Sequence, residues 1–160
     1  MPFTGYAGNN PLSMVLPGCG GSGAFGVQST DCDYNLCQNA TVTLTASQID
    51  SMFTTPIVLI PAPGAGLAII VDSIAFKLVN GGTNFAGGGV VTISYQGGGA
   101  TVVPTVAAAV VNGATSTTQL AQNATTVTAS INQGIQITNA TGVFTTGNGT
   151  LTLNITYTII

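Results

Sequence analysis

Charge is almost absent from this chain, which has no Glu, Arg, His or Trp among its 160 residues. Charged side chains make up 3% of the sequence, against about 25% in a typical soluble domain. They are Asp31, Asp33, Asp50, Asp72 and Lys77. The surface must therefore be built from Thr, Ser, Asn, Gln, Gly and exposed backbone.

The lack of basic residues excludes the common nucleic-acid interfaces. Binding to phosphates needs clustered Lys or Arg, and one lysine supplies no such cluster. Little charge is left to keep copies apart in solution, and the mean hydropathy of +0.53 predicts apolar surface buried between chains. We expect an oligomer or a component of a larger assembly.

The absence of histidine removes the base that serine and cysteine hydrolases use to activate their nucleophile. General acid–base catalysis is left with aspartates and one lysine. Asp50 and Asp72 are the only candidates for a pair of acids inside the domain, as a carbohydrate-active enzyme would need. Asp72 and Lys77 are five residues apart, which places them on opposite faces of a regular strand. We expect no enzyme.

A long apolar run, residues 55–79, raises the question of a membrane span. It is interrupted by Pro61, Pro63, Gly64 and Gly66, which break a helix, so its apolar arms are shorter than the roughly 20 residues that cross a bilayer. The run instead predicts two strands joined by a structural turn at Pro63, Gly64 and Gly66. The N-terminus lacks a basic and apolar leader, which predicts a protein made and kept in a cytoplasm.

Composition divides the chain at about residue 40. Residues 1–40 contain Gly-rich and Pro-rich stretches without sustained periodicity, which predicts an extended N-terminal arm. The arm carries apolar side chains that would be wasted in water, and we expect it to bind a partner through Phe3, Tyr6, Leu12, Met14, Val15, Leu16 and Phe25. Residues 41–160 alternate apolar and polar side chains and form the domain proper.

This domain is expected to be an all-β, antiparallel, jelly-roll-like β-sandwich with one short helix. Thr45 and Gln48 form a capping box for the helix, whose apolar side is Ile49 with Met52 or Phe53. Strands are expected near residues 41–45, 57–60, 67–79, 90–96, 125–131, 134–138 and 151–159, the last with Leu151, Leu153, Ile155, Tyr157 and Ile159 on one face. The segment at 102–113 is ambiguous between strand and one helical turn, because Pro104 interrupts it.

Metal and thiol chemistry have weak signals, both in the arm. Asp31, Asp33 and Asn35 match the first ligand positions of a calcium loop, but Leu36 and Val42 replace its glycine and its bidentate glutamate. An Asx-rich turn explains them equally. A disulfide is possible among Cys19, Cys32 and Cys37, with packed reduced thiols as the alternative, and zinc would lack a usual fourth ligand. We expect no cofactor.

Two stretches resemble a group of small proteins encoded by tailed bacteriophages, including those that infect cyanobacteria. They are TVTLTASQIDSMFTTPIVLIPAPGAGLAIIV at 41–71 and GNGTLTLNITYTII at 147–160. In that group a strand, a short S-x-Q-I helix, a TPI strand and an APGAG turn open a β-sandwich, and a GxGTL strand closes it. The resemblance covers about 45 of the 160 residues and does not include the cysteine-bearing arm.

The resemblance implies a capsid decoration (cement) protein, which would form a homotrimer over joints between major capsid subunits on the virion surface. The expected partners are the major capsid protein and other copies of this chain, with no nucleic acid and no membrane, after synthesis in the bacterial host cytoplasm. The alternatives are a tail-fibre or receptor-binding module of a phage and a subunit of a surface-layer or pilus-like polymer.

Overall fold

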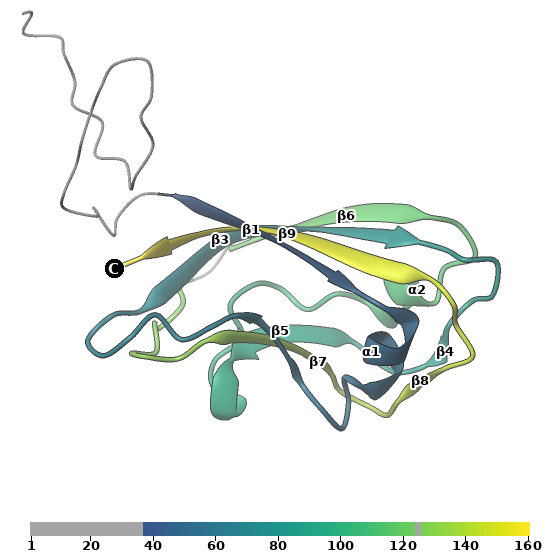
Figure 1. Ribbon diagram of the computed structural model, residues 1–160, viewed down its shortest axis with the longest axis horizontal. Coiled ribbons are helices and arrows are strands. Elements are labelled where there is room, and N and C mark those ends of the chain that lie inside the picture. Colours follow the sequence, from purple (N-terminus) through teal and green to yellow (C-terminus); the bar gives the residue numbers. More distant parts are fainter. Residues whose placement is uncertain (1–36, 124–125) are drawn as a thin grey trace, which may run out of the picture. The chain divides into compact units, whose positions relative to one another are not determined.

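Strands dominate the computed structural model, which describes residues 37–123 and 126–160 (Figure 1). Within these residues one antiparallel sheet has the order β1-β9-β3-β6 and a second, facing it, has the order β2-β7-β5. The first sheet consists of β1 (Gln38–Leu44), β9 (Thr150–Ile159), β3 (Ile69–Val79) and β6 (Thr117–Gln122). The second consists of β2 (Ile57–Ile60), β7 (Ile135–Asn139) and β5 (Val91–Tyr95).

The chain moves repeatedly between the two sheets, as in a jelly roll. β1, β3, β6 and β9 belong to the first sheet, and β2, β5 and β7 lie between them in the sequence but in the second sheet. Residues 101–106 lie along the free side of β5 through the isolated bridges Val91↔Val106 and Ser94↔Thr101. The expected jelly-roll-like sandwich is therefore confirmed. Residues 101–106 take the place of an edge strand beside β5 but pair with it through these two bridges alone.

Short elements close one end of the sandwich, at the right of Figure 1. They are α1 (Ala46–Ser51), α2 (Ala108–Val111), β4 (Ala86–Gly87) and β8 (Phe144–Thr145). A 3-10 turn, η1 (Gln96–Gly98), follows β5. The ambiguous segment around Pro104 thus contains a single helical turn, α2, after the stretch that bridges to β5.

The capping box at α1 is present as predicted. Thr45 Oγ1 accepts a hydrogen bond from the Gln48 backbone N–H at 3.4 Å, and Gln48 Oε1 accepts one from the Thr45 N–H at 2.9 Å. Ile49 and Met52 are fully buried, whereas Phe53 is 41% exposed. The cap orients α1 so that its apolar side covers the end of the core.

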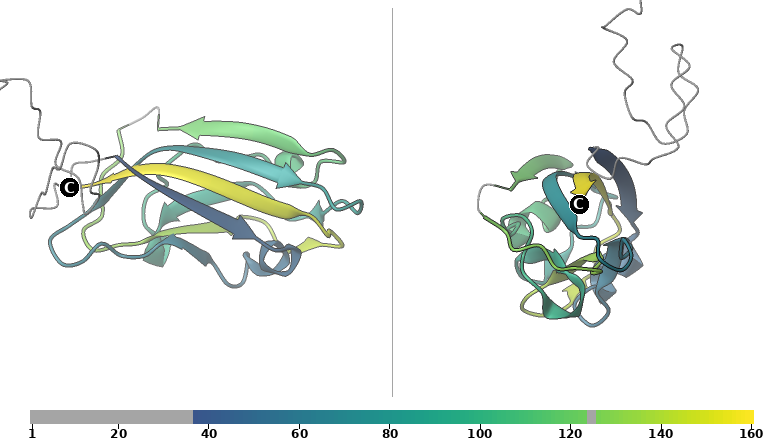
Figure 2. Two further views of the ribbon diagram at one scale, coloured as in Figure 1. Left: turned by 45° about the horizontal axis from the view of Figure 1, so that its top comes forward. Right: turned by 90° about the vertical axis from the view of Figure 1, so that its left-hand side faces the viewer.

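The core lies between the two sheets and follows the period of two in the strands. In β9, Leu151, Leu153 and Ile155 are buried, and Tyr157 and Ile159 pack against the same cluster. All five side chains therefore share the inward face, as the sequence predicts. Both views in Figure 2 show the four-stranded sheet as one continuous layer of the sandwich.

A β-bulge in β3 corrects the prediction for Asp72 and Lys77. The register with β9 shifts between Val71 and Ser73, so Val71 and Ile74 are both buried although they are three residues apart. The bulge inserts one extra outward residue and changes the phase of the alternation. Asp72 and Lys77 consequently point to the same, outward face, and both are exposed.

The turn at 61–66 joins β2 to β3, but these two strands do not pair with each other as a hairpin. β2 pairs with β7, while β3 pairs with β9 and β6, so the turn crosses between sheets. The expected strand at 125–131 is not formed by its described residues 126–130, and Ile131 makes only an isolated bridge with Ala68. The strand that precedes residues 125–131 in the sequence is β6, at residues 117–122, and it pairs with β3.

The turn at 61–66 has glycine where its backbone adopts positive φ. Gly64 has φ 113° and Gly66 has φ 82°, and the Leu67 N–H donates to the Gly64 carbonyl at 3.2 Å. A Cβ at either glycine would meet no atom within 4 Å. Backbone strain is therefore the only cost of adding a side chain.

Replacing either glycine by valine should lower the free energy of unfolding by about 1 to 2 kcal/mol, the cost of a left-handed backbone for an L-residue. Urea denaturation of Gly64→Val and Gly66→Val measures the loss. Ala65→Val, an exposed position between them with negative φ, is the matched control and should unfold like the parent. Equal stability of all four proteins would show that the turn does not constrain the fold.

Tyr95 ties the two sheets together. Its ring is fully buried in the core, and its hydroxyl donates a hydrogen bond to the Ile69 carbonyl across the sandwich. Burial raises the pKa of the Tyr95 hydroxyl above its usual value of 10.0, and a backbone hydrogen bond with Ser130 partly opposes that rise. The neutral phenol is thus the form that the folded state favours.

Because the folded pKa of Tyr95 is raised, its contribution to stability should be complete below about pH 10 and should fall as the pH rises through the folded pKa. Tyr95→Phe removes this titration together with the buried hydrogen bond, at a cost of about 1 kcal/mol near neutral pH. Urea denaturation from about pH 8 to pH 11 should show a steeper loss for the parent than for Tyr95→Phe. Parallel curves would contradict the assignment.

Candidate functional site

The outward face of the four-stranded sheet is a grid of short, mostly uncharged polar side chains. The strand register aligns its outward residues in three rows across β1, β9, β3 and β6. The rows are Asn39, Thr156, Ser73 and Gln122; Thr41, Asn154, Ala75 and Leu120; and Thr43, Thr152, Lys77 and Thr118. Lys77 is the only charged member of this grid.

Hydrogen bonds between side chains link β1 to β9 in every row. Thr41 Oγ1 donates to Asn154 Oδ1 at 2.8 Å, and Thr156 Oγ1 donates to Asn39 Oδ1 at 3.0 Å. The hydroxyls of Thr43 and Thr152 are 3.0 Å apart and share a hydrogen bond. Threonine side chains are already stiff at χ1, so these bonds hold the β1 and β9 half of the grid in a fixed arrangement. Such a face can bind through shape and neutral hydrogen bonds.

Asp72 lies next to the grid, at the bulge of β3. Its Oδ2 accepts from Thr158 Oγ1 at 3.4 Å and lies 3.8 Å from the Cys37 thiol. Lys77 lies five residues further along the same strand, about 16 Å away at 3.3 Å per residue. The two opposite charges on this face are therefore too far apart to form an ion pair.

The acids of the sandwich do not converge. Asp50 lies on α1, the helix that follows β1, and Leu44 at the end of β1 pairs with Leu151 near the start of β9. Asp72 lies at the bulge opposite Thr156 and Tyr157, near the other end of β9. About 20 Å of strand separates these positions, so the pair considered for a carbohydrate-active cleft is not formed. Asp50 Oδ1 is buried and has no hydrogen-bond partner within the described residues.

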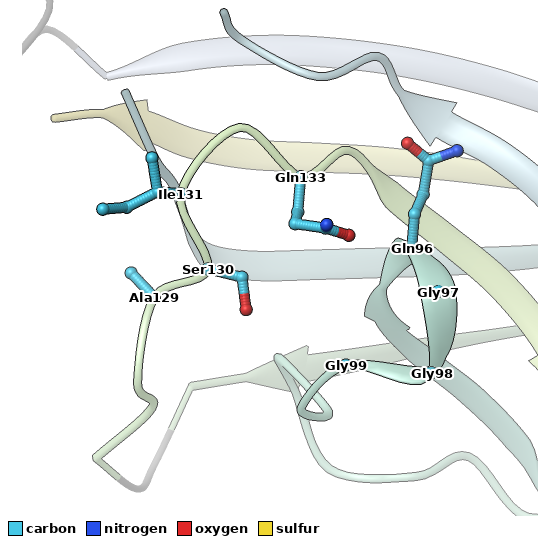
Figure 3. A pocket seen from close by; sticks show the side chains of 8 residues that line it. All are labelled: Gln96, Gly97, Gly98, Gly99, Ala129, Ser130, Ile131 and Gln133. Atoms are coloured by element: carbon cyan, nitrogen blue, oxygen red, sulfur yellow. The ribbon is translucent and has the colours of Figure 1, made fainter. Parts of the chain in front are cut away.

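A hollow of about 550 Å³ lies at the end of the second sheet (Figure 3). Its walls are the turn Gly97–Gly99 with Gln96, and the segment Ala129–Ile131 with Gln133. Figure 3 shows Ser130 and Gln133 pointing toward the glycine turn. Gln96 Oε1 is occupied, because it accepts from the Gly134 N–H at 3.2 Å. No charged or aromatic residue lines the hollow, so its polar groups are neutral amides and hydroxyls, beside the apolar side chains of Ala129 and Ile131.

Most of the site residues predicted from the sequence lie outside the described residues. These are the calcium candidates Asp31, Asp33 and Asn35, the thiols Cys19 and Cys32, and the partner-binding residues Phe3, Tyr6, Leu12, Met14, Val15, Leu16 and Phe25. Cys37 is described: its thiol is free and exposed. Within residues 37–123 and 126–160 no group of three or more Cys or Asp side chains can hold a metal, and no helix is long and apolar enough to cross a membrane.

The comparisons with known proteins leave the family open. No protein-family model matches the chain, and no curated protein matches it. A chain from the solved capsid asymmetric unit of cyanophage Pam1 superposes with a TM-score of 0.47 and 16% sequence identity. The superposition covers 77% of this chain and 83% of that one.

Sequence reasoning missed β6 and with it a quarter of the grid. The strand TTQLAQ has Thr117, Gln119 and Ala121 on its inward side, so it lacks the apolar period of two by which the other strands are found. Its only large apolar side chain, Leu120, points outward and is 56% exposed. The sequence signal for β6 is therefore an inverted alternation, in which polar and small residues point inward and the one large apolar residue points outward.

Proposed function

We propose that this chain is a structural virion protein of a tailed bacteriophage. It acts as a cement (decoration) protein that binds the outside of the head and stabilises joints between major capsid subunits. The observation that carries the proposal is the grid on the four-stranded sheet, a rigid, hydrogen-bonded, nearly uncharged face. The sequence resemblance supplies the class of protein and adds trimeric assembly to the proposal.

The two stretches that carry the resemblance lie together in the structure. Residues 41–71 contain most of β1, all of α1 and β2, and the start of β3, and residues 147–160 contain β9. β9 pairs with both β1 and β3, so the two stretches meet in the first sheet. They include five of the twelve residues of the grid, namely Thr41, Thr43, Thr152, Asn154 and Thr156.

A binding face without charge suits a protein that coats a repeating lattice. Each contact relies on area and neutral hydrogen bonds, and many copies acting on one particle compensate for weak individual contacts. The affinity of such an attachment should depend little on salt or pH, because the face has few charges to screen and few groups to titrate. The same features give no support to an enzyme, because the described acids lie apart and the chain has no histidine.

A receptor-binding module of the phage tail is the second candidate, favoured by the hollow between Gln96–Gly99 and Ala129–Gln133. Amide and hydroxyl groups such as those of Ser130 and Gln133 match the hydroxyl groups of a neutral glycan. Glycan sites usually add an aromatic platform, which this hollow lacks. Binding of the purified chain to host cells, and not to heads, would favour this candidate.

The cement function predicts that the purified chain binds phage heads that lack it, and that binding changes by less than about threefold between about 50 and 500 mM salt. Ala75→Lys places a charge in the centre of the grid and should reduce binding at least about tenfold by burying an unpaired charge. Val58→Lys, at an exposed position of the second sheet, is the matched control and should bind like the parent. Cosedimentation with heads measures all three.

Single replacement of Asp31, Asp33, Asp50 or Asp72 by Asn should leave head binding within about twofold, because no carboxylate lies in the grid. Strong salt dependence, or lost binding in a folded Asp→Asn variant, would contradict a neutral interface. Loss of binding with a chelator would assign a calcium function to Asp31, Asp33 and Asn35. Equal binding by Ala75→Lys and the parent would show that the contact lies elsewhere.

A further inference from the structure

The outer edge of β6 is an open strand edge without the usual protection. Among the described residues, β6 pairs with β3 alone and ends the order β1-β9-β3-β6. Natural edge strands are commonly protected by Lys, Pro, a bulge or a covering loop. The sequence TTQLAQ contains no charge and no proline, and its register with β3 is regular over all six residues. Such an edge is ready to accept another strand.

The backbone groups that point outward from this edge can be identified. The Asn123 N–H donates to the Asp72 carbonyl at 2.9 Å, which fixes the phase of the ladder between β6 and β3. In an antiparallel pair, hydrogen-bonded and non-hydrogen-bonded positions alternate. Residues 117, 119 and 121 therefore bond to β3, and Thr118, Leu120 and Gln122 direct their N–H and C=O groups away from it.

The same three residues place their side chains on the grid. Thr118, Leu120 and Gln122 are all exposed, in a row that is polar, apolar and polar. Leu120 is 56% exposed and lies beside Ala75. This row is symmetric about Leu120 both in its side chains and in its free backbone groups.

We propose that β6 pairs with β6 of a second copy of this chain, antiparallel, about a two-fold axis at Leu120. Leu120 then faces Leu120 of the partner subunit, and Thr118 faces Gln122 of the partner subunit. The free N–H and C=O groups of the row find partners, and the two exposed leucines cover each other. The two four-stranded sheets become one sheet of eight strands, and the grid doubles in area.

Electrostatics permits this pairing. Lys77 is the only charged residue of the grid, and it pairs with Thr118 in β3–β6. Across the proposed axis it lies about 20 Å from Lys77 of the partner subunit, given 4.8 Å between strands and 3.4 Å per residue. That separation exceeds the Debye length of about 8 Å at physiological salt, so the two lysines repel each other little.

The other open edge of this sheet, β1, fits less well as the partner of β6. Head-to-tail pairing would place Leu120 against the β1 row of Asn39, Thr41 and Thr43 of the next copy. The side chains of that row already bond to β9 and include no large apolar group. Self-pairing of β6 covers more apolar surface. It also gives an even number of copies, two alone or six when combined with a trimer.

Cysteine cross-linking tests the register in the full-length chain with Cys19, Cys32 and Cys37 replaced by Ser. Across the axis the two residues 120 have Cα atoms about 5.5 Å apart, within disulfide range, whereas two residues 118 or two residues 122 are more than 10 Å apart. Leu120→Cys should become a linked dimer on mild oxidation. Thr118→Cys and Gln122→Cys should each stay without a cross-link alone but should link to each other when mixed.

Sedimentation gives a second readout. Leu120→Lys should halve the mass of the parent assembly while circular dichroism stays unchanged, because two lysines would meet at the axis. Equal linkage at positions 118, 120 and 122, or an unchanged mass for Leu120→Lys, would overturn the proposal. Linkage of Leu120→Cys to Thr41→Cys in place of self-linkage would overturn it in favour of head-to-tail pairing with β1.

Discussion

The long antiparallel pairing of β3 with β9 is the interaction on which the rest of the structure depends. It runs from Ile69 opposite Ile159 to Val79 opposite Thr150, with one bulge near Asp72. Each strand gives its alternate side chains to the core, so one ladder aligns the buried residues of both strands. β1 and β6 attach to the two outer sides of this pair. A slip of one residue would exchange core and surface throughout the first sheet.

The same register produces the surface proposed to bind the capsid. Because the inward residues are fixed by the core, the outward residues of β1, β9 and β3 are aligned in rows, in which Thr, Asn and Ser predominate and Ala75 and Lys77 are the exceptions. Side-chain hydrogen bonds then hold Thr41 against Asn154 and Thr156 against Asn39. A face made in this way is stiff and nearly neutral, which suits attachment by area in many copies. The register of the first sheet therefore sets both the residues that form the core and the residues of the proposed binding face.

Strong local patterns made much of the fold predictable from the sequence. Alternating apolar residues identified β9, the Thr45 and Gln48 pair identified α1, and Pro63 with Gly64 and Gly66 identified the turn between β2 and β3. Pairing partners were not predictable, because a turn looks the same whether it joins neighbouring strands or crosses between sheets. The length of β3 indicated a bend or bulge, but its position at Asp72 and the inverted strand β6 were not predictable, because tertiary packing, not local pattern, decides which side of these residues is buried. The grid could not be predicted from the sequence, because its rows depend on how four strands pair with one another.

Imaging virions with and without this chain tests the central claim most directly. A cement protein should appear as density for a β-sandwich on the outside of the head, over joints between major capsid subunits, with the four-stranded sheet against the capsid or against neighbouring copies. Particles that lack the chain should lose this density and should release their DNA at a lower temperature. Density confined to the tail, or heads of unchanged composition and heat resistance in its absence, would contradict the account.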